Sequence, residues 1–306
     1  MPATLQYRPT LIDGLITQPR MASYQSVFAP ANDVELMGVY LWNVHVCGAI
    51  YPLISLVEVF LRNAIDQVLT TGLGQFWWSG SRLRYRSFIS GAVSPRVICA
   101  IRENFSAASS KYIAEQRHRY GMRGRVMSNH HGVIAKTEFS TWQFLLDSEF
   151  MGRGLIWPKY LGKVFAGLWP GTQGSHVLSF AYDLVATLRE FRNRLFHHEP
   201  AWKRFGVLTE VDAIQHLREK ISKIQDLLAL IHPENIRLVQ KNGLLRAAYR
   251  ACSSDEIRRF QHMAQTYPVN TLGDLALLVQ RSVADNATLH ARLDGNARER
   301  FIISPH

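Results

Sequence analysis

The sequence contains little cysteine, and no two of its cysteines are close together. Cys47, Cys99 and Cys252 are odd in number and widely separated. A disulfide framework needs an even set, and a thiolate zinc site usually contains a Cys-x2-Cys pair. The cysteines therefore argue against both and favour a protein of a reducing compartment.

Long apolar runs are also missing. The first residues, MPATLQYRPTLIDG, contain no apolar stretch of the kind found in a secretory signal. The longest apolar run, around 46–57, contains Gly48 and Pro52 and is followed by Glu58 and Arg62. It is shorter than the roughly 20 residues of a membrane-spanning helix. These absences predict a soluble, cytoplasmic protein without a membrane segment.

Acidic residues are scarce relative to basic ones. The 306 residues include 35 Lys and Arg against 24 Asp and Glu, so the net charge is +11 with neutral His. Residues 79–136 hold eleven Lys and Arg and two acids, which places nine of the eleven net charges in this basic segment. Such a concentration favours a polyanionic partner, most simply nucleic acid, although a solvated basic loop would have the same composition. The candidate RNA-binding residues are Arg82, Arg84, Arg86, Arg117, Arg119, Arg123 and Arg125.

The pattern of apolar residues predicts an all-α chain. Hydrophobic residues make up 47% of the sequence, enough for a sizeable core. Alternation typical of strands is not found, nor is an internal repeat. The predicted parts are a loop-rich segment (1–40) with a short helix near 11–16, a helical domain (41–240) that includes the basic segment, and a small helical appendage (241–306). Helices are predicted over 33–46, 52–70, 95–106, 111–119, 137–150, 157–168, 175–198, 210–231, 254–265 and 271–283.

Arginine, asparagine and histidine converge near the end of the helix predicted at 175–198. Asn193 and His197 are four residues apart and share a helix face, and the long side chain of Arg192 can reach the same point. Imidazole can give or take a proton near neutral pH, and a guanidinium can bind phosphate through two N–H groups. These groups suit metal-independent cleavage of RNA by its own 2′-hydroxyl.

Spacing alone is weak evidence for this chemistry. An Arg-x4-His pair arises by chance in a chain with this much Arg and His, and the sequence holds a second one, Arg125 and His130. A histidine at a helix end beside surface arginines would look the same.

The wider context resembles a known family. The string RNRLFHHEPAW at 192–202 closely resembles the motif of bacterial Abi-like (abortive infection) proteins of the HEPN superfamily. Other blocks agree in the same order over roughly 20–235. They are the segment 41–69 with its Glu58-x3-Arg62-Asn63 element, FWW at 76–78, GVIAKTEFSTWQFLL at 132–146 and HLREKISKIQDLLALIHP at 216–233. Ser140-Thr141 departs from the Gly-Phe that relatives usually carry before the tryptophan.

The resemblance implies a HEPN-type helical bundle that acts as a homodimeric, metal-independent endoribonuclease without a cofactor. Arg192 would bind phosphate, His197 would transfer protons and Asn193 would be the polar residue that follows the arginine. His198 is a second candidate for the histidine, and Arg194 is a possible supporting residue. The implied role is a toxin-like effector of phage defence, restrained by an RNA or an antitoxin protein.

Several residues carry more than one interpretation. Glu58, Arg62 and Asn63 lie in an apolar helix, where a buried charge needs a partner. They could bridge to the Arg192 helix, contact the catalytic site directly or form an unrelated ion pair. His130-His131 is interpreted first as loop, then as an RNA contact. A metal site is disfavoured there, as it is at His197-His198-Glu199.

The tryptophans are interpreted mainly as core residues. Trp77 and Trp78, beside the basic segment, are the best candidates for base stacking.

Two further functional hypotheses stay open. The chain could be a non-catalytic RNA-binding protein that carries, or is regulated by, a structured small RNA. It could also be a protein-interaction scaffold that uses the electrically neutral segment 254–306.

Overall fold

The computed structural model describes residues 10–80, 82–121, 124, 126–293 and 300–305. Of these residues 66% are helical and 5% lie in strands, so the structure is mainly helical, as predicted. Two of the candidate RNA-binding residues, Arg123 and Arg125, lie outside the described residues.

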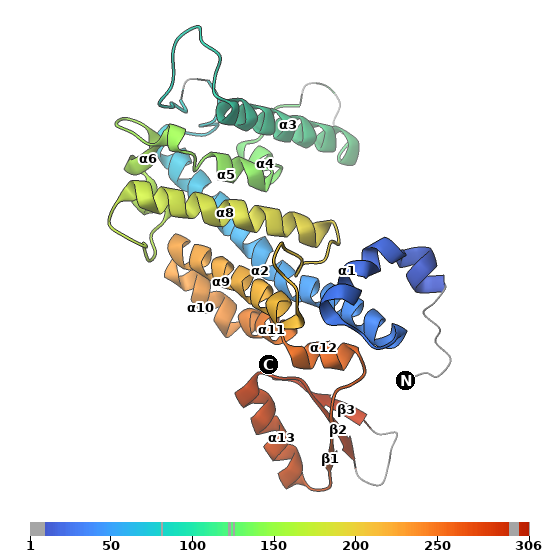
Figure 1. Ribbon diagram of the computed structural model, residues 1–306. Helices are drawn as coiled ribbons and strands as arrows, with labels where there is room; N and C mark the ends of the chain where they lie inside the picture. The colour runs from blue at the N-terminus through green and yellow to red at the C-terminus, as the bar shows by residue number, and fades with distance from the viewer. Residues whose placement is uncertain (1–9, 81, 122–123, 125, 294–299, 306) are drawn as a thin grey trace. The chain divides into compact units, whose positions relative to one another are not determined.

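The elements follow one another along the chain as Figure 1 labels them. The N-terminal and central helices are a π-helical turn η1 (Thr10–Ile16), α1 (Gln18–Phe28), α2 (Asp33–Leu73), α3 (Arg96–Arg119), α4 (His130–Ala135), α5 (Phe139–Phe144), a 3-10 turn η2 (Ser148–Phe150), α6 (Ile156–Lys159), α7 (Leu161–Val164), α8 (Gly174–Phe196) and α9 (Glu210–Ile231). The C-terminal elements are α10 (Pro233–Lys241), α11 (Leu244–Ala251), α12 (Ser254–Phe260), β1 (Thr266–Val269), α13 (Leu272–Asp285), β2 (Leu289–Leu293) and β3 (Arg300–Ile303).

These elements form two compact units that interleave along the sequence. The first unit comprises residues 1–53, 193–222 and 239–306, and the second comprises 54–192 and 223–238. Helices α2, α8, α9 and α10 each contribute residues to both units. The three consecutive parts predicted from the sequence stay a prediction.

Aromatic side chains and one buried carboxylate organise the second unit. Helix α3 lies beside α4 and α5 there (Figure 1). Trp77 and Trp142 are fully buried, and Phe105 of α3 packs edge-on against both. The Trp77 indole donates a 2.8 Å hydrogen bond to Asp66 of α2, which is itself 7% exposed. The aromatic block that follows α2 therefore fastens that helix to the rest of the unit.

The first unit has an aromatic core of its own. Trp202 packs edge-on against Tyr24 and Phe28, with ring centroids 5.2 and 5.0 Å away. The Trp42 indole donates a 2.8 Å hydrogen bond to the carbonyl of Ala251. At Gly38 a Cβ would lie 2.6 Å from the Phe260 carbonyl oxygen, so only glycine allows α2 to approach the end of α12 this closely. These contacts join the N-terminal helices to the C-terminal segment.

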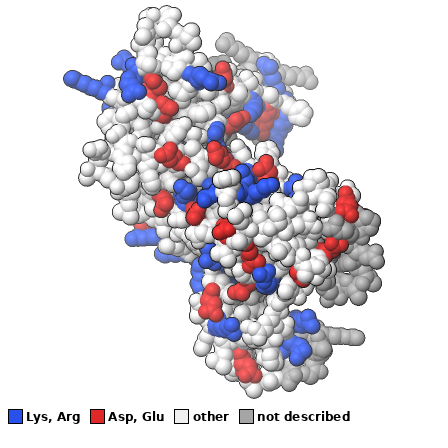
Figure 2. Space-filling model, in the orientation of Figure 1, with Lys and Arg blue, Asp and Glu red and all other residues white. Residues whose placement is uncertain are grey.

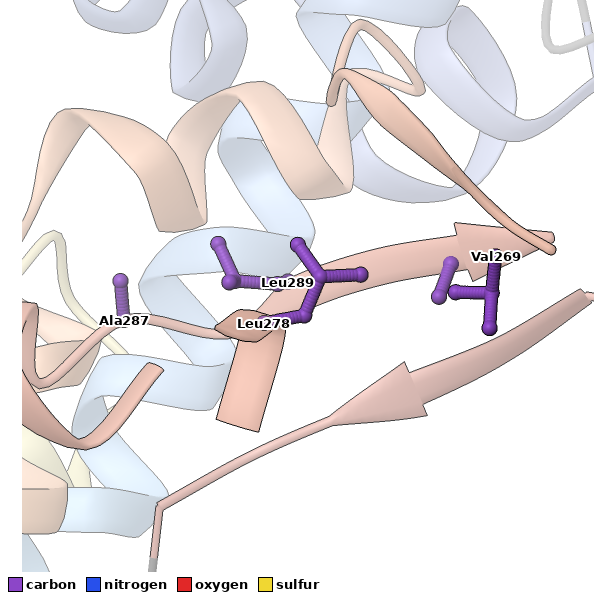
Figure 3. Close-up of a cluster of buried hydrophobic side chains, with 5 residues drawn as sticks. Val269, Leu278, Ala287 and Leu289 are labelled. Carbon is purple, nitrogen blue, oxygen red and sulfur yellow. The ribbon is translucent and has the colours of Figure 1, made fainter. Parts of the chain in front are cut away.

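A small sheet ends the chain and corrects the prediction that no strands are present. Strands β1 and β2 are parallel and β2 and β3 are antiparallel, in the order β1-β2-β3. Figure 3 shows the apolar cluster of the sheet and α13, which includes Val269, Leu278, Ala287 and Leu289. The strands are only four or five residues long, which is too short for alternation to be recognised against chance.

Other predicted boundaries were wrong for physical reasons. The helices predicted at 33–46 and 52–70 are one helix, α2, with Pro52 inside it. Buried Ile50, Leu53 and Ile54 flank the proline. Their tertiary packing stabilises the helix at this point, although the proline removes one helical hydrogen bond. The loop-rich prediction for 1–40 missed α1, and the two helices at 95–106 and 111–119 are the single helix α3.

The helices predicted at 137–150 and 157–168 are both interrupted. Residues 137–150 form α5 and the short turn η2. Trp157, inside α6, has extended backbone angles because it precedes Pro158. Tyr160 separates the single turn α6 from the single turn α7. The prediction at 210–231 matches α9.

Helix α2 is long and apolar enough to cross a membrane, judged by length and composition alone. An 18-residue window within it has a mean hydropathy of 1.9, and 33% of that window is buried. The sequence expectation of no such segment relied on the short apolar run around 46–57, which Glu58 and Arg62 follow. The exposed side chains of α2 include Leu41, Val44 and Tyr51.

Candidate functional site

The Arg-x4-His string occupies the C-terminal end of α8. The Glu199 N–H donates to the Arg194 carbonyl at 3.0 Å, and the His198 N–H donates to the Leu195 carbonyl at 3.3 Å. This pair of bonds is a Schellman motif, in which the residue after the C-cap adopts the left-handed conformation. His198 is that residue, with φ +55°, so His197 is the C-cap.

The turn that follows the string is fixed to other parts of the first unit. The Ala201 N–H donates a 2.9 Å hydrogen bond to the Asn43 side chain of α2, and Trp202 is buried. The His198 carbonyl accepts a hydrogen bond from Arg20 of α1. The Arg194 guanidinium donates to the Lys203 carbonyl within the turn. Both Arg194 and the His198 backbone therefore have structural partners.

His197 and Asn193 face solvent at this helix end. Both side chains are exposed, and the His197 N–H donates a 2.9 Å helical hydrogen bond to the Asn193 carbonyl. Because residues four apart lie one above the other on a helix, the imidazole and the carboxamide share one face. They are accessible to a solvent-borne substrate.

Arg192 belongs to the second unit and pairs with a carboxylate of α2. Its Nε lies 3.7 Å from the Glu58 Oε2, with the two side chains 32% and 20% exposed. This ion pair is the predicted bridge from Glu58 to the Arg192 helix, and it is also a direct contact with a candidate catalytic residue. The third interpretation, an unrelated ion pair, does not fit it. Glu58 therefore positions the guanidinium of Arg192, and guanidinium groups bind phosphate through charge-assisted hydrogen bonds.

The other members of the Glu58 element do not join this pair. Asn63 is exposed to solvent. Arg62 is half-buried, and its buried Nε makes no hydrogen bond within the described residues. The i, i+4 ion pair between Glu58 and Arg62 is not formed there either.

Some cations of the basic segment form ion pairs with acidic residues, and others are exposed without an ion pair within the described residues. Arg119 and Lys136 both pair with Glu115, and Lys111 pairs with Glu138. Arg82, Arg84, Arg86 and Arg117 are exposed. On the face that Figure 2 draws, groups of basic side chains alternate with acidic ones instead of forming one continuous surface.

His130 is the residue whose interpretation changes most. It is not in a loop but begins α4 and is 3% exposed. Its Nδ1 accepts a 3.0 Å hydrogen bond from the Phe76 N–H, so the proton of the neutral ring must be on Nε2. That nitrogen lies 3.1 Å from the Asp66 Oδ1 and 3.2 Å from the Thr70 hydroxyl.

The same hydrogen bonds decide whether a metal fits beside His130. Ligand atoms of Asp66, His130 and His131 lie within 4.8 Å of one another. A ligating nitrogen must be unprotonated. Nδ1 is engaged by Phe76 and Nε2 carries the proton toward Asp66, so His130 has no lone pair for an ion. We interpret the group as a structural network that joins α2 to α4.

Trp78 is half-buried and stacks on rings of its own unit, and its candidate role in base stacking stays a prediction. One face of its ring stacks on Phe105, with centroids 4.4 Å apart and planes 3° apart. Its ring also stacks on His130 at 4.9 Å and 29°. Trp77, Trp142, Trp157 and Trp202 are buried as predicted, and Trp169 is 36% exposed.

A groove on the first unit lies next to the motif and was not foreseen from the sequence. It has a volume of about 260 Å³, and its lining includes Val44, Gly48 and Tyr51 of α2 together with Leu195 and His198. The exposed Phe196 packs against Tyr51, with ring centroids 5.2 Å apart. Phe205 is fully exposed in the turn before α9.

Sequence reasoning also missed His216, which lies on the apolar stripe of α9. It is 6% exposed, and its buried Nδ1 makes no hydrogen bond within the described residues. Burial, together with the nearby charges of Lys220 and Arg204, lowers its pKa to about 4. A lone histidine on an amphipathic helix gives no sequence signal of this environment.

Comparison with models of protein families, with curated proteins and with solved structures finds no match to the chain. The function is therefore inferred from the residues described above and from the sequence motif that they contain.

Proposed function

We propose that the protein is a metal-independent endoribonuclease of the HEPN type, with a HEPN-like helical bundle around Arg192 and His197. The observation that carries the proposal is the end of α8. There a half-buried Arg192 is held by Glu58, and His197 is exposed at the C-cap beside Asn193. Cation, carboxamide and imidazole at one helix end are the groups that cleavage of RNA by its 2′-hydroxyl requires.

The proposed reaction needs no group beyond these side chains and the substrate. A base takes the proton of the 2′-hydroxyl, whose oxygen attacks the adjacent phosphorus. An acid returns a proton to the departing 5′-oxygen, which leaves a 2′,3′-cyclic phosphate and a 5′-hydroxyl. Imidazole can serve in either role. Arg192 would stabilise the negative charge that gathers on the phosphate oxygens.

A homodimer would supply two histidines to one reaction. The exposed apolar side chains Val44, Tyr51 and Phe196 lie beside the motif on the first unit. Exposed apolar patches of this kind mark interaction surfaces. We propose that a second copy of the chain covers this groove, which would bring one His197 from each copy to the same cleft.

The biological role that fits this activity is a toxin-like effector of phage defence that acts in the cytoplasm. An RNase with exposed catalytic groups must be restrained until it is needed. The net charge of +11 makes RNA a natural restraining partner, and an antitoxin protein is the alternative.

Cleavage of a labelled RNA in the presence of EDTA tests the proposed activity. We expect fragments that end in 2′,3′-cyclic phosphate or 3′-phosphate. Fragments with a 3′-hydroxyl, or activity that appears only with added divalent ions, would contradict it.

A second candidate is a non-catalytic protein that carries a structured small RNA. The exposed cations Arg82, Arg84, Arg86 and Arg117 of the basic segment favour this candidate. Sequencing the RNA that copurifies with the protein separates the two functions. One dominant small RNA that binds equally to wild type and to the Arg192→Ala variant would favour binding over cleavage, provided that the variant cleaves RNA no more slowly than wild type does.

A further inference from the structure

A hollow in the second unit brings together cations that are far apart in the sequence. It has a volume of about 330 Å³ and lies between the end of α2, the segment that follows α2, and α6. Three cations line it: Arg82 and Arg84 from the basic segment, and Lys159 from α6. No carboxylate is among its lining residues. The remaining lining is mostly apolar and includes Leu73 and Ile156.

The Arg82 guanidinium is held in position at the hollow. Its Nη1 donates a 2.7 Å hydrogen bond to the Gln75 carbonyl, just beyond the end of α2. That bond uses one of the five N–H donors of an arginine. It orients the side chain and leaves other donors for a ligand, so less conformational entropy is lost when a ligand binds.

Lys159 is positioned by the floor of the hollow. Its Nζ lies 4.7 Å from the centroid of the Tyr160 ring, a cation–π distance. Tyr160 is 5% exposed and lies against Gly72, where a Cβ would be 2.3 Å from the tyrosine hydroxyl oxygen. Glycine at this position of α2 therefore lets the ring sit under the lysine.

The charges of this hollow are not compensated by protein groups within the described residues. No ion pair there joins Arg82, Arg84 or Lys159 to a carboxylate, although Arg119, Lys136 and Lys111 of the same unit all have acidic partners. Three like charges around one concave site repel each other and raise the local concentration of anions. An anion bound among them would remove that repulsion.

We propose that this hollow binds the phosphate group of a nucleotide unit. Two guanidinium groups and an ammonium group suit a phosphate better than a single carboxylate, because they offer many N–H donors to its several oxygens. The volume is at the lower end of the about 300–1,000 Å³ range of ligand sites, which suits one nucleotide unit. The assignment of that phosphate to an RNA strand, as opposed to a free nucleotide, rests on the proposed function.

The test uses the full chain and probes that it cannot cleave. Isothermal titration calorimetry is done with ADP, with inorganic pyrophosphate and with a 2′-O-methyl RNA oligonucleotide, which has no 2′-hydroxyl to attack. For the variant Arg82→Gln/Lys159→Gln we expect a Kd at least about tenfold weaker than that of wild type. The single variant Arg84→Gln should give a smaller loss. All of these side chains are exposed, and thermal unfolding checks that each variant is folded.

The matched control removes the same charge elsewhere in the second unit. Lys163→Gln/Arg237→Gln changes two exposed cations that do not line the hollow, and it should bind each probe within about twofold of wild type. A selective loss for the oligonucleotide assigns the phosphate to RNA, and a selective loss for ADP or pyrophosphate assigns it to a free ligand. Equal losses in both double variants, or no binding of any probe by wild type, would overturn the proposal. Because no probe is cleaved, this result is independent of whether the protein is a ribonuclease.

Discussion

The Arg192 Nε lies 3.7 Å from the Glu58 Oε2, an ion pair that joins α8 to α2 within the second unit. The pair is partly exposed, so its contribution to folding stability is small, about 0–1 kcal/mol. Its functional consequence is larger if Arg192 binds the scissile phosphate, since Glu58 then decides where the guanidinium points. Glu58 would be a positioning residue that does not itself touch RNA.

Replacing Glu58 should therefore slow cleavage more than it weakens folding. For Glu58→Gln we expect kcat to fall about 10- to 100-fold, because the guanidinium loses its orientation. KM for RNA and the midpoint of thermal unfolding should stay close to wild type, and Glu58→Asp should recover part of kcat. Steady-state kinetics and thermal unfolding on the same samples measure this. A loss of Tm that parallels the loss of kcat would mean that Glu58 acts only on stability.

The left-handed backbone of His198 predicts that glycine is tolerated at this position. At φ +55° glycine is less strained than histidine, while glycine costs more entropy on folding. His198→Gly should change the free energy of unfolding by no more than about 1 kcal/mol and should retain cleavage. Urea unfolding and an RNA cleavage assay measure the two effects. Loss of cleavage in a folded His198→Gly protein would assign the catalytic histidine to position 198 instead of 197.

The sequence could predict what depends on neighbours along the chain. The end of the motif helix, the helix at 210–231 and the burial of Trp142 and Trp202 follow from periodicity and proline placement. The bridge from Glu58 to the Arg192 helix was one of three interpretations, chosen because a charge in an apolar helix needs a partner. These inferences needed no knowledge of distant contacts.

Pairings between remote segments could not be predicted from the sequence. Asp66 and His130 are 64 residues apart, and their hydrogen bond turns an expected loop histidine into a buried one. Pro52 was expected to start a helix, because the hydrogen bond that a proline removes is a local cost that the sequence shows. The packing of Ile50 and Leu53 that offsets this cost is tertiary, so the sequence does not show it. The strands of the C-terminal sheet gain stability only from their pairing and from α13.

Gly167 should be intolerant of any side chain. A Cβ there would lie 1.7 Å from the Ala229 carbonyl oxygen, and the Gly167 N–H donates a 3.0 Å hydrogen bond to the Leu230 carbonyl. Gly167→Ala should destabilise the fold by about 3 kcal/mol or more, because backbone must move. The matched control is Gly48→Ala in α2, where a Cβ meets nothing within 4 Å. It should stabilise by about 0.5–1 kcal/mol.

Urea unfolding of the two alanine variants at one protein concentration measures this difference. Equal stabilities of Gly167→Ala and Gly48→Ala would contradict the close approach described for Gly167.

The buried His216 predicts a loss of stability in mild acid. Its pKa is lowered from 6.5 to about 4 in the folded chain by burial and by nearby cations. Between these pH values the unfolded chain binds more protons, so the free energy of unfolding decreases as pH falls through this window. The contribution of this one group is about 1–3 kcal/mol. Urea unfolding between pH 7.5 and pH 4.5 measures the slope.

The variant His216→Leu removes this group without removing the others. The pKa values of His45 and His290 are also lowered, mainly by burial, and contribute a slope of the same sign in both proteins. The stability of His216→Leu should therefore decline less steeply with falling pH than that of wild type. Identical slopes would show that His216 is not the titrating group.

Single-turnover cleavage of an RNA in EDTA by wild type, Arg192→Ala and His197→Ala tests the central claim most directly. Removing a general acid or base costs about 10²- to 10⁴-fold in rate, so we expect His197→Ala to lose at least that much and Arg192→Ala to lose a comparable amount. Both variants should remain folded, because His197 is exposed and the Arg192 pair is partly exposed. A folded His197→Ala protein that cuts RNA as fast as wild type would contradict the account.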